Sequence, residues 1–378
     1  MNRPVRGALV GFGFIAESGH APEYARRQAN GEVEIVALAD GCAARRETAR
    51  RAFPSARVYD SHVALLEQEA AHLDYVDITT PPYAHADVAH AALSRGLHVL
   101  CEKPIATSGD AAKSMADHAI GARRVVFPCH NYRHAPVIQE VRSVLASGAI
   151  GAVHLVTLQT FRTTHARGVR EWRPDWRRER KLAGGGIAMD HGSHTLYLAF
   201  EWLKSYPTSV TAKSDTLDQF DTEDNFSCTL TFPTGVATAH LTWTAGVRKV
   251  IYTLHGSRGA ITVDDDVVTV HLANGGGAVT SRPVQTRVVS SHWMDASHKE
   301  WFGRLFDEFL LAVRDGDYVG ARMTDAIHCI DTIDAAYESA ARDSREVAIV
   351  GPHQAREREH RARPASIRAV ESETTPRS

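Results

Sequence analysis

The sequence predicts an α/β protein: an N-terminal doubly wound Rossmann domain plus a C-terminal α+β domain with an open, largely antiparallel sheet. Short apolar runs alternate with helical segments over the first 128 residues, and a glycine-rich turn follows the first run. Beyond residue 150, longer strands follow one another on short turns. Apolar strands joined by helices are typical of a parallel sheet, whereas consecutive strands on tight turns pair antiparallel.

A length of 378 residues exceeds what one hydrophobic core ordinarily supports, so we expect two domains. We place the Rossmann domain at 1–128 and the second domain, for substrate binding and oligomerisation, at 129–350. The segment 351–378 is charged and carries few large apolar residues, which predicts a disordered tail.

The expected elements follow the apolar pattern and its turn residues. In the first domain we expect strands at 5–10, 33–39, 75–78, 97–101 and 125–127, and helices at 15–28, 84–95 and 111–119. In the second we expect strands at 153–160, 226–232, 236–244 and 249–255, and helices at 187–204, 298–314 and 322–341.

Composition excludes several classes of partner. The 43 basic and 45 acidic residues give a net charge of −2, which supplies no field for nucleic acid or an anionic membrane. No apolar run reaches the roughly 18 residues that span a bilayer. The five cysteines are scattered and form no C-x-x-C pair, which is typical of reduced thiols in a cytoplasmic protein.

A dinucleotide fingerprint of the form G-x-G-x-x-A follows the first predicted strand and opens a predicted helix. Its residues are Gly11, Phe12, Gly13, Phe14, Ile15 and Ala16. The glycines allow a tight turn and close approach of a pyrophosphate, and the helix N-terminus attracts its charge. The alternative is a loop with no ligand, but strand, turn and helix stand in the required order.

Asp40 ends the second predicted strand. An acid at this place hydrogen-bonds the adenosine ribose and repels a 2′-phosphate. The sequence therefore predicts NAD as cofactor, with NADP disfavoured.

Further motifs carry a family resemblance. They are Thr80-Pro81-Pro82 with His85, Gly96 to Leu100 leading into Glu102-Lys103-Pro104, Gly184-Gly185-Gly186, and Asp190-x-x-x-His194. In their order and spacing the chain resembles the Gfo/Idh/MocA oxidoreductases, relatives of glucose–fructose oxidoreductase and inositol dehydrogenase, from about residue 5 to residue 345.

The resemblance implies roles for these residues. It places Lys103 beside the nicotinamide and makes Lys103, Asp190 and His194 catalytic. It assigns the cofactor cleft a lining of Thr79, Thr80, Pro81, Pro82, His85 and Glu102. Many relatives carry an acid three residues after the histidine, where Tyr197 stands here, which weakens the case for a cyclitol or simple sugar.

The chemistry suits these residue types. Residues four apart on a helix share a face, so Asp190 and His194 are expected to point the same way, with Tyr197 and Glu201 continuing the stripe. His194 is a suitable general base with a pKa near working pH, and Lys103 can stabilise charge on the substrate oxygen. The alternative is a buried structural histidine and an acid that favours a helix start.

Other candidates concern metal and substrate. Asp190-His191-x-x-His194 and His130-x-x-x-His134 have ligand-like spacing, but we expect no metal, because H-E-x-x-H and cysteine pairs are absent from the sequence. The loop 162–181 is rich in arginine and tryptophan; it is a solvated lid or subunit contact, or a lid that pairs with an anionic substrate. Candidate substrate contacts are Asn131, Trp172, Arg173, Trp176, Arg177 and Tyr197.

The sequence thus predicts an NAD(P)-dependent dehydrogenase acting on a secondary alcohol or ketone of a small polar substrate, which is a sugar, a cyclitol or a phosphorylated or acidic derivative. The alternatives are a redox-neutral, NAD-retaining hydrolase or lyase, and a non-catalytic NAD sensor. We also expect a homo-oligomer, a dimer or tetramer, formed through an apolar open face of the second sheet.

Overall fold

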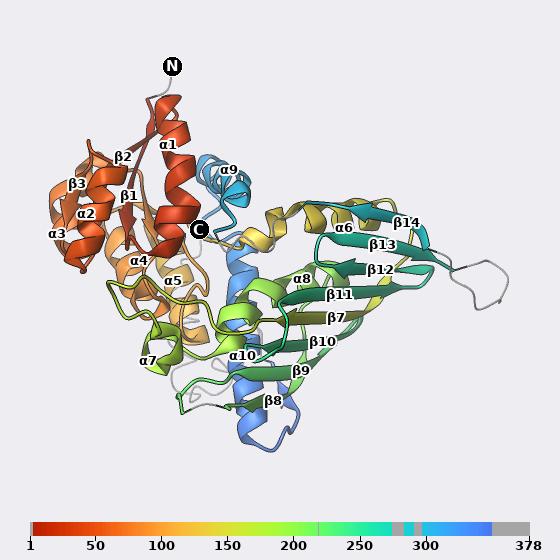
Figure 1. Ribbon diagram of the computed structural model, residues 1–378. Helices are drawn as coiled ribbons and strands as arrows, with labels where there is room; N and C mark the ends of the chain where they lie inside the picture. The colour runs from red at the N-terminus through yellow and green to blue at the C-terminus, as the bar shows by residue number, and fades with distance from the viewer. Residues whose placement is uncertain (1–2, 218, 274–282, 291–296, 350–378) are drawn as a thin grey trace, which may run out of the picture.

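The computed structural model describes residues 3–217, 219–273, 283–290 and 297–349. The tail expected at 351–378 lies outside these residues. Two sheets dominate the molecule, and Figure 1 shows them side by side with helices packed on each. In the described part, no helix is long and apolar enough to cross a membrane.

The first sheet is a six-stranded parallel sheet of order β3-β2-β1-β4-β5-β6. Its strands are β1 (Val5–Val10), β2 (Val33–Ala39), β3 (Arg57–Tyr59), β4 (Tyr75–Ile78), β5 (His98–Cys101) and β6 (Val126–Pro128). Its helices are α1 (Ala21–Ala29), α2 (Ala43–Ala52), α3 (His62–Glu69), α4 (His85–Leu93) and α5 (Gly109–Ala122). This is the predicted Rossmann sheet, and its strand order reverses between β1 and β4, where ligands bind in such folds.

The helix predicted at 15–28 is helical from its first residue, but it contains a π-helical turn near its start. Residues Ala16–His20 form a π-helical turn, and α1 begins only at Ala21. Turns of this kind often accompany functional sites because the wider turn changes the direction of the following side chains. Here the turn ends at His20, whose side chain is buried.

The second sheet has nine strands in the order β14-β13-β12-β11-β7-β10-β9-β8-β15. Its strands are β7 (Val153–Phe161), β8 (Ser209–Asp215), β9 (Asn225–Phe232), β10 (Gly235–Thr242), β11 (Lys249–Gly256), β12 (Gly259–Asp264), β13 (Val267–Leu272), β14 (Pro283–Val288) and β15 (Val347–Ala348). All neighbours pair antiparallel except β7 and β10, which are parallel.

Helices cover one face of this sheet. They are α6 (Pro136–Ala146), α8 (Ser193–Leu203) and α10 (Ala321–Ala341), while the short α7 (Arg180–Ala183) precedes the glycine run. The open face carries many polar side chains, such as Thr157, Gln159, Thr229, Thr238 and His240. The expected apolar open face is therefore largely polar, because threonine satisfies β-propensity without adding a large apolar surface.

Helix α9 (Lys299–Asp315) belongs to the packing of the first sheet, although the sequence placed it in the second domain. Its residues Phe302, Phe306 and Phe309 pack with Tyr24 and Tyr75 in one buried cluster. Figure 1 shows α9 beside α1. The chain therefore returns to the first domain after completing the second sheet.

Candidate active site

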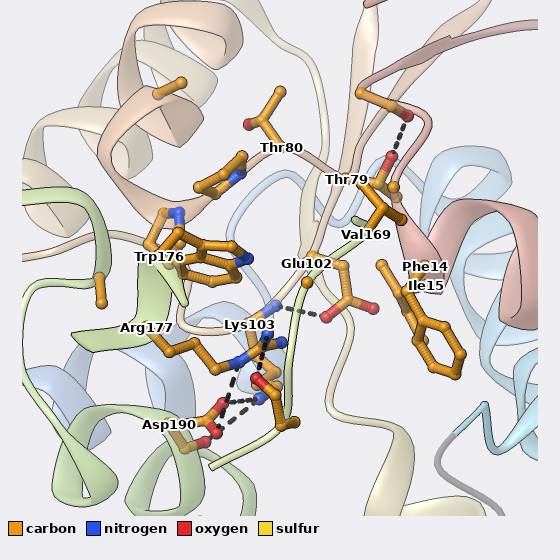
Figure 2. A pocket seen from close by; sticks show the side chains of 18 of the residues that line it. Phe14, Ile15, Thr79, Thr80, Glu102, Lys103, Val169, Trp176, Arg177 and Asp190 are labelled. Carbon is orange, nitrogen blue, oxygen red and sulfur yellow. Dashed lines mark hydrogen bonds and ion pairs between the residues drawn. The ribbon is translucent and has the colours of Figure 1, made fainter. Parts of the chain in front are cut away.

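A cavity of about 820 Å³ lies where the two domains meet. The Rossmann domain lines it with the glycine-rich turn, the ends of β2 and β4, and the segment after β5. The second domain lines it with the loop after β7 and the start of the helix that contains His194. Figure 2 shows side chains from both domains directed into this space.

The glycine-rich turn has the shape that a dinucleotide pyrophosphate requires. Gly11 has a φ of +91°, and a Cβ there would lie 2.8 Å from the backbone of Thr79. A Cβ at Gly13 would meet no atom within 4 Å, so backbone is exposed to the cavity at this point. Phe14 and Ile15 line the cavity as predicted for the turn.

Phe12 is a correction to the predicted lining. Its side chain is fully buried and packs edge-on against Phe53, and it is outside the cavity lining. Its backbone N–H already donates to Asp40 Oδ2 at 2.7 Å. The same carboxylate accepts from the Cys42 N–H at 2.7 Å while lining the cavity. Each oxygen has a further lone pair that a ribose hydroxyl can use.

Of the residues after β4 that were predicted to bind the cofactor, all but one line the cavity. Thr79, Thr80, Pro81 and Pro82 line the cavity, and Thr79 Oγ1 donates to the Gly11 carbonyl at 2.6 Å. His85 is outside the lining. Its ring nitrogens lie 2.9 Å from the Pro104 carbonyl and 2.8 Å from the Thr80 carbonyl, so it connects the two cofactor-side segments without reaching the cavity.

Lys103 and Asp190 meet across the domain boundary. Lys103 Nζ lies 2.8 Å from Asp190 Oδ1, and both side chains are largely buried. Arg177 Nε lies 3.6 Å from the other carboxylate oxygen of Asp190. Burial alone raises the pKa of Asp190, but Lys103 and Arg177 outweigh it and hold this pKa well below its usual range. Figure 2 shows the three side chains converging.

His194 lines the same cavity, with its ring stacked on Tyr132 at 4.2 Å between centroids. Burial, and then the charge of Lys103, lower the pKa of His194 well below 6.5. The expected pKa near working pH is therefore wrong: the imidazole is neutral at neutral pH, which leaves a ring nitrogen free to act as an acceptor but makes it a weaker base than expected.

The residue that fixes this helix start was missed from the sequence. Glu223, fully buried in a loop before β9, accepts from the N–H groups of Gly186 and Ala188 at 2.9 and 3.0 Å. Tyr337 on α10 donates to the same carboxylate at 2.8 Å. The bonded N–H groups would otherwise lack partners at a helix start, so Glu223 sets the direction of Asp190 and His194. No sequence spacing connects it to the glycine run.

The arginine- and tryptophan-rich loop is only partly directed at the cavity. Trp172, Trp176 and Arg177 line it, and Arg177 stacks over the Trp176 ring at 4.3 Å. Arg173 is a correction, since it is exposed and pairs with Glu179 at 2.7 Å. Exposed arginines find partners locally when an acid stands nearby in sequence.

Of the two remaining candidate substrate contacts, one lines the cavity and the other does not. Asn131 lines the cavity, and its buried Oδ1 has no hydrogen-bond partner among the described residues. Tyr197 does not reach the cavity: it is fully buried between the ring of His130, at 4.1 Å, and the guanidinium of Arg133, at 4.6 Å. The predicted substrate contact of Tyr197 is therefore wrong for this structure.

A buried charge network lies beneath Lys103 and was also missed. His20 Nδ1 lies 2.7 Å from Asp77 Oδ2, and its Nε2 lies 3.2 Å from Glu102 Oε1. Glu102 lines the cavity and accepts from the Lys103 N–H at 3.0 Å. Although burial opposes the charge, the two carboxylates raise the pKa of His20 to about 9, so it is an imidazolium at neutral pH.

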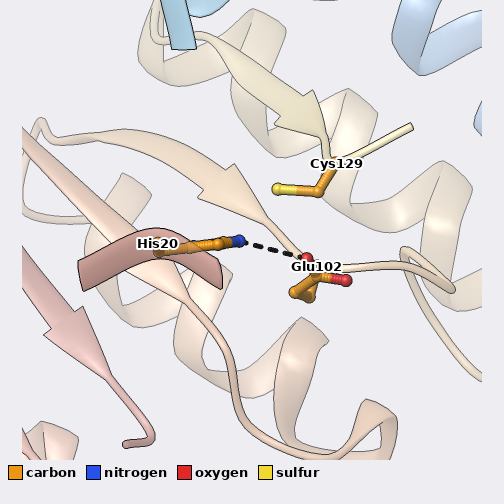
Figure 3. Close-up of side chains that lie close together, drawn as sticks. All are labelled: His20, Glu102 and Cys129. Atoms are coloured by element: carbon orange, nitrogen blue, oxygen red, sulfur yellow. Dashed lines mark hydrogen bonds and ion pairs between the residues drawn. The ribbon is translucent and has the colours of Figure 1, made fainter. Parts of the chain in front are cut away.

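His20, Glu102 and Cys129 are also the one group of potential metal ligands that comes together in the described part of the chain, within 4.8 Å of one another (Figure 3). The histidine pairs considered from the sequence do not contribute to it. An imidazolium with both nitrogens occupied cannot ligate a metal, and burial raises the pKa of the Cys129 thiol well above 9. The electrostatics therefore favour a proton-linked network.

Comparison with known proteins agrees with this geometry. Residues 5–130 match the oxidoreductase family with an NAD-binding Rossmann fold, and residues 138–262 match the GFO/IDH/MocA C-terminal domain. The chain belongs to the Gfo/Idh/MocA oxidoreductase family. The NAD cofactor of this family fits the exposed backbone at Gly13 and the position of Asp40.

Several relatives of this Gfo/Idh/MocA protein carry assigned names. It is 28% identical to D-glucoside 3-dehydrogenase of Escherichia coli (strain K12), over 58% of this chain and 60% of that one. It is 27% identical to inositol 2-dehydrogenase of Rhizobium meliloti (strain 1021), over 91% of this chain and 99% of that one. Levoglucosan dehydrogenase in complex with NADH shares the fold, with a TM-score of 0.78 and 22% identity. The match covers 92% of this chain and 99% of that one.

The His20 network predicts a pH-dependent stability. A histidine whose pKa rises from 6.5 to about 9 on folding stabilises the protein fully below pH 6.5, and this contribution is lost as the pH rises through 9. We expect His20→Gln to cost roughly 3 kcal/mol at pH 6 and much less at pH 10, measured by chemical denaturation.

The matched control is His85→Gln. His85 is also buried, but burial lowers its pKa, so its protonation does not change above pH 7. The loss of unfolding free energy in His85→Gln should therefore be constant from pH 7 to pH 10. A cost of His20→Gln that is equally constant would show that His20 acts through packing alone.

Proposed function

We propose that this oxidoreductase transfers a hydride between NAD and a secondary alcohol, or the corresponding ketone, of a small sugar-like substrate. The observation that carries the proposal is the convergence of Lys103, Asp190 and His194 on one cavity that is continuous with the glycine-rich turn. The names of the relatives support it, since they include dehydrogenases of a glucoside and of inositol.

In this reaction each residue of the site has its own role. Bound NAD supplies the hydride acceptor. Neutral His194 accepts the hydroxyl proton as the substrate is oxidised, because its lowered pKa leaves the imidazole unprotonated. Lys103 donates a hydrogen bond to the substrate oxygen and stabilises its growing negative charge, and Asp190 holds the ammonium in place at 2.8 Å.

Removing either acting group should slow the chemical step. We expect Lys103→Met and His194→Ala each to lower kcat by roughly 10²-fold or more, measured as NADH absorbance over a panel of polyols and sugars. NAD affinity should change little in His194→Ala, since His194 belongs to the second domain.

Lys113→Met is the matched control, because it breaks a similar lysine–aspartate ion pair, to Asp331 at 2.7 Å, outside the cavity lining. It should keep normal kcat. The wild-type pH profile should also lack a titration near 6.5, given the lowered pKa of His194. Near-normal kcat in both site variants would refute the assigned roles, whereas the absence of turnover of any substrate by the wild type would favour an NAD sensor.

Cofactor choice depends on Asp40. We expect a wild-type preference for NAD over NADP in kcat/KM, and a roughly tenfold loss of that preference in Asp40→Ala, since hydrogen bonds to a charged group contribute about 1.5–3 kcal/mol. Asp40→Asn is the control, because it removes the charge but keeps the shape of the side chain and one of the two oxygen acceptors that now bind the Phe12 and Cys42 N–H groups. A wild type that prefers NADP would overturn the assignment.

A second candidate function is redox-neutral catalysis with retained NAD, as in a hydrolase or lyase on a sugar-like substrate. The observation that favours it is the course of the loop after β7. Residues 163–169 line the cavity, and the Glu171 carbonyl accepts from Cys42 Sγ of the Rossmann domain at 3.5 Å. Figure 2 shows Val169 in the same cavity as Phe14 and Ile15.

The loop is also braced internally. Asp175 accepts from Arg167 at 3.0 and 3.1 Å and lies 3.0 Å from His165 Nε2. A braced loop across the cleft slows cofactor exchange. Under the second function we expect NAD to remain with the protein through dialysis, with turnover but no free NADH, and Asp175→Asn to speed NAD release. Accumulation of free NADH in proportion to product would leave the dehydrogenase as the function.

A cytoplasmic location and a homo-oligomer remain predictions. The five cysteines, four of them buried, are all free thiols, which accords with a reducing compartment. The polar open face of the second sheet is the surface that we propose a second copy covers, through threonine-rich contacts.

A further inference from the structure

Arg162 is a buried cation in the substrate half of the cavity. It directly follows β7, is only 8% exposed, and lines the cavity. Its Nη1 donates to the carbonyls of Phe161 at 2.9 Å and Lys249 at 3.4 Å. A side-chain hydrogen bond also links the guanidinium to Tyr132. All of these partners are uncharged, so the five-donor guanidinium can still take a charged acceptor.

Within the described ranges, Arg162 has no carboxylate within 4.0 Å. The four other buried arginines of the described residues do, and they are listed here with their acids: Arg27 with Glu23, Arg45 with Glu17, Arg133 with Glu201 and Asp325, and Arg178 with Asp224. A buried charge without a counter-charge is costly, so arginine is rarely buried unless it is paired. The burial of Arg162 beside open space therefore indicates a partner that enters through the cavity.

The surrounding charge points to an anion. Among described residues, the second domain contributes one acid to the cavity lining, Asp190, and four arginines, at 162, 167, 177 and 248. The positive field is evident at His191, where burial and then Arg162, Lys103 and Arg177 lower the pKa to about 3 despite Asp190. Asp190 is already bound by Lys103 and Arg177, so it does not serve Arg162.

We propose that Arg162 is a specificity-determining residue that binds an oxyanion group of the substrate, a carboxylate or a phosphate. The inference rests on the proposed function and narrows its substrate class to acidic sugar derivatives. Asn131, which is 9% exposed and whose Oδ1 has no partner among the described residues, lines the same cavity and provides an acceptor for a substrate hydroxyl.

This assignment replaces the arginines that the sequence nominated. Arg173 is exposed and paired with Glu179. Arg177 is engaged by Asp190, by the Trp176 ring and by the Ala166 carbonyl at 3.1 Å. The sequence alone did not distinguish these loop residues from Arg162. In the structure, Arg162 directly follows the end of β7 and its side chain lines the cavity.

The test compares a hexose, its uronic acid and its 6-phosphate as substrates, with NADH formation as readout. In the wild type we expect kcat/KM to be at least tenfold higher for one of the two anions than for the hexose. Which anion gains identifies carboxylate or phosphate as the bound group. Arg162→Gln should lose about tenfold or more on that anion and little on the hexose.

Two further variants separate specificity from structure. Arg162→Lys keeps the charge and should recover part of the loss on the anion, whereas Arg173→Gln removes a charge from the exposed loop and should change nothing. Equal losses on all three substrates in Arg162→Gln would make Arg162 a structural support and overturn the proposal. A wild type with a higher kcat/KM for the hexose than for either anion would also overturn the proposal. This measurement uses the wild type alone, so it does not depend on whether a variant folds.

The two proposals fail differently. If the neutral hexose yields NADH at least as well as both anions, the dehydrogenase stands and the anion site is refuted. If no member of a broad polyol and sugar-acid panel yields NADH, the dehydrogenase itself is refuted.

Discussion

A row of alternating charges crosses the domain boundary, and the site depends on it. It runs from Asp77 through His20, Glu102, Lys103 and Asp190 to Arg177. Successive side chains lie 2.7 to 3.6 Å apart, except that Glu102 contacts the backbone N–H of Lys103, at 3.0 Å, and acts on its ammonium through space. Buried charges are tolerated only when each is paired and hydrogen-bonded. Because each member of this row has neighbours of opposite sign, the Lys103 side chain is held in place in a cavity lined by both domains.

The row requires support on both sides. On the Rossmann side, the π-helical turn brings His20 between two carboxylates, and its ring stacks on Phe302 of α9 at 3.8 Å. On the other side, Glu223 holds the helix start that presents Asp190. The return of α9 to the first sheet is therefore part of the site, since it packs the residue that balances Glu102.

The sequence was sufficient for features that depend on local pattern. The strands β1 and β2 have the expected bounds, because each is an apolar run ended by turn residues. The cavity-lining positions of Thr80, Lys103 and Asp190 agree with motifs a few residues long. What could not be predicted depends on contacts between distant segments, such as His20 with Asp77 or Glu223 with Gly186, for which no spacing rule exists.

The error at Tyr197 has a geometric cause. A regular helix would carry the stripe from Asp190 and His194 on to Tyr197 and Glu201. The π-helical turn Ala188–Gly192 precedes His194 and Tyr197, and both of these lie in the regular helix α8. Tyr197 is nearly one turn further along, where α8 has left the cavity and packs in the hydrophobic core. Glu201 binds Arg133 and Arg142.

The alternating row also explains why the anion site must lie elsewhere in the cavity. Its members already neutralise one another, so an anionic substrate that bound Lys103 or Arg177 would compete with Asp190 and disturb the group that acts on the substrate oxygen. Arg162 lies outside the row and its charge is not compensated by a described carboxylate. Separating the charge that binds the substrate from the charges that act on it lets each be held in its own geometry.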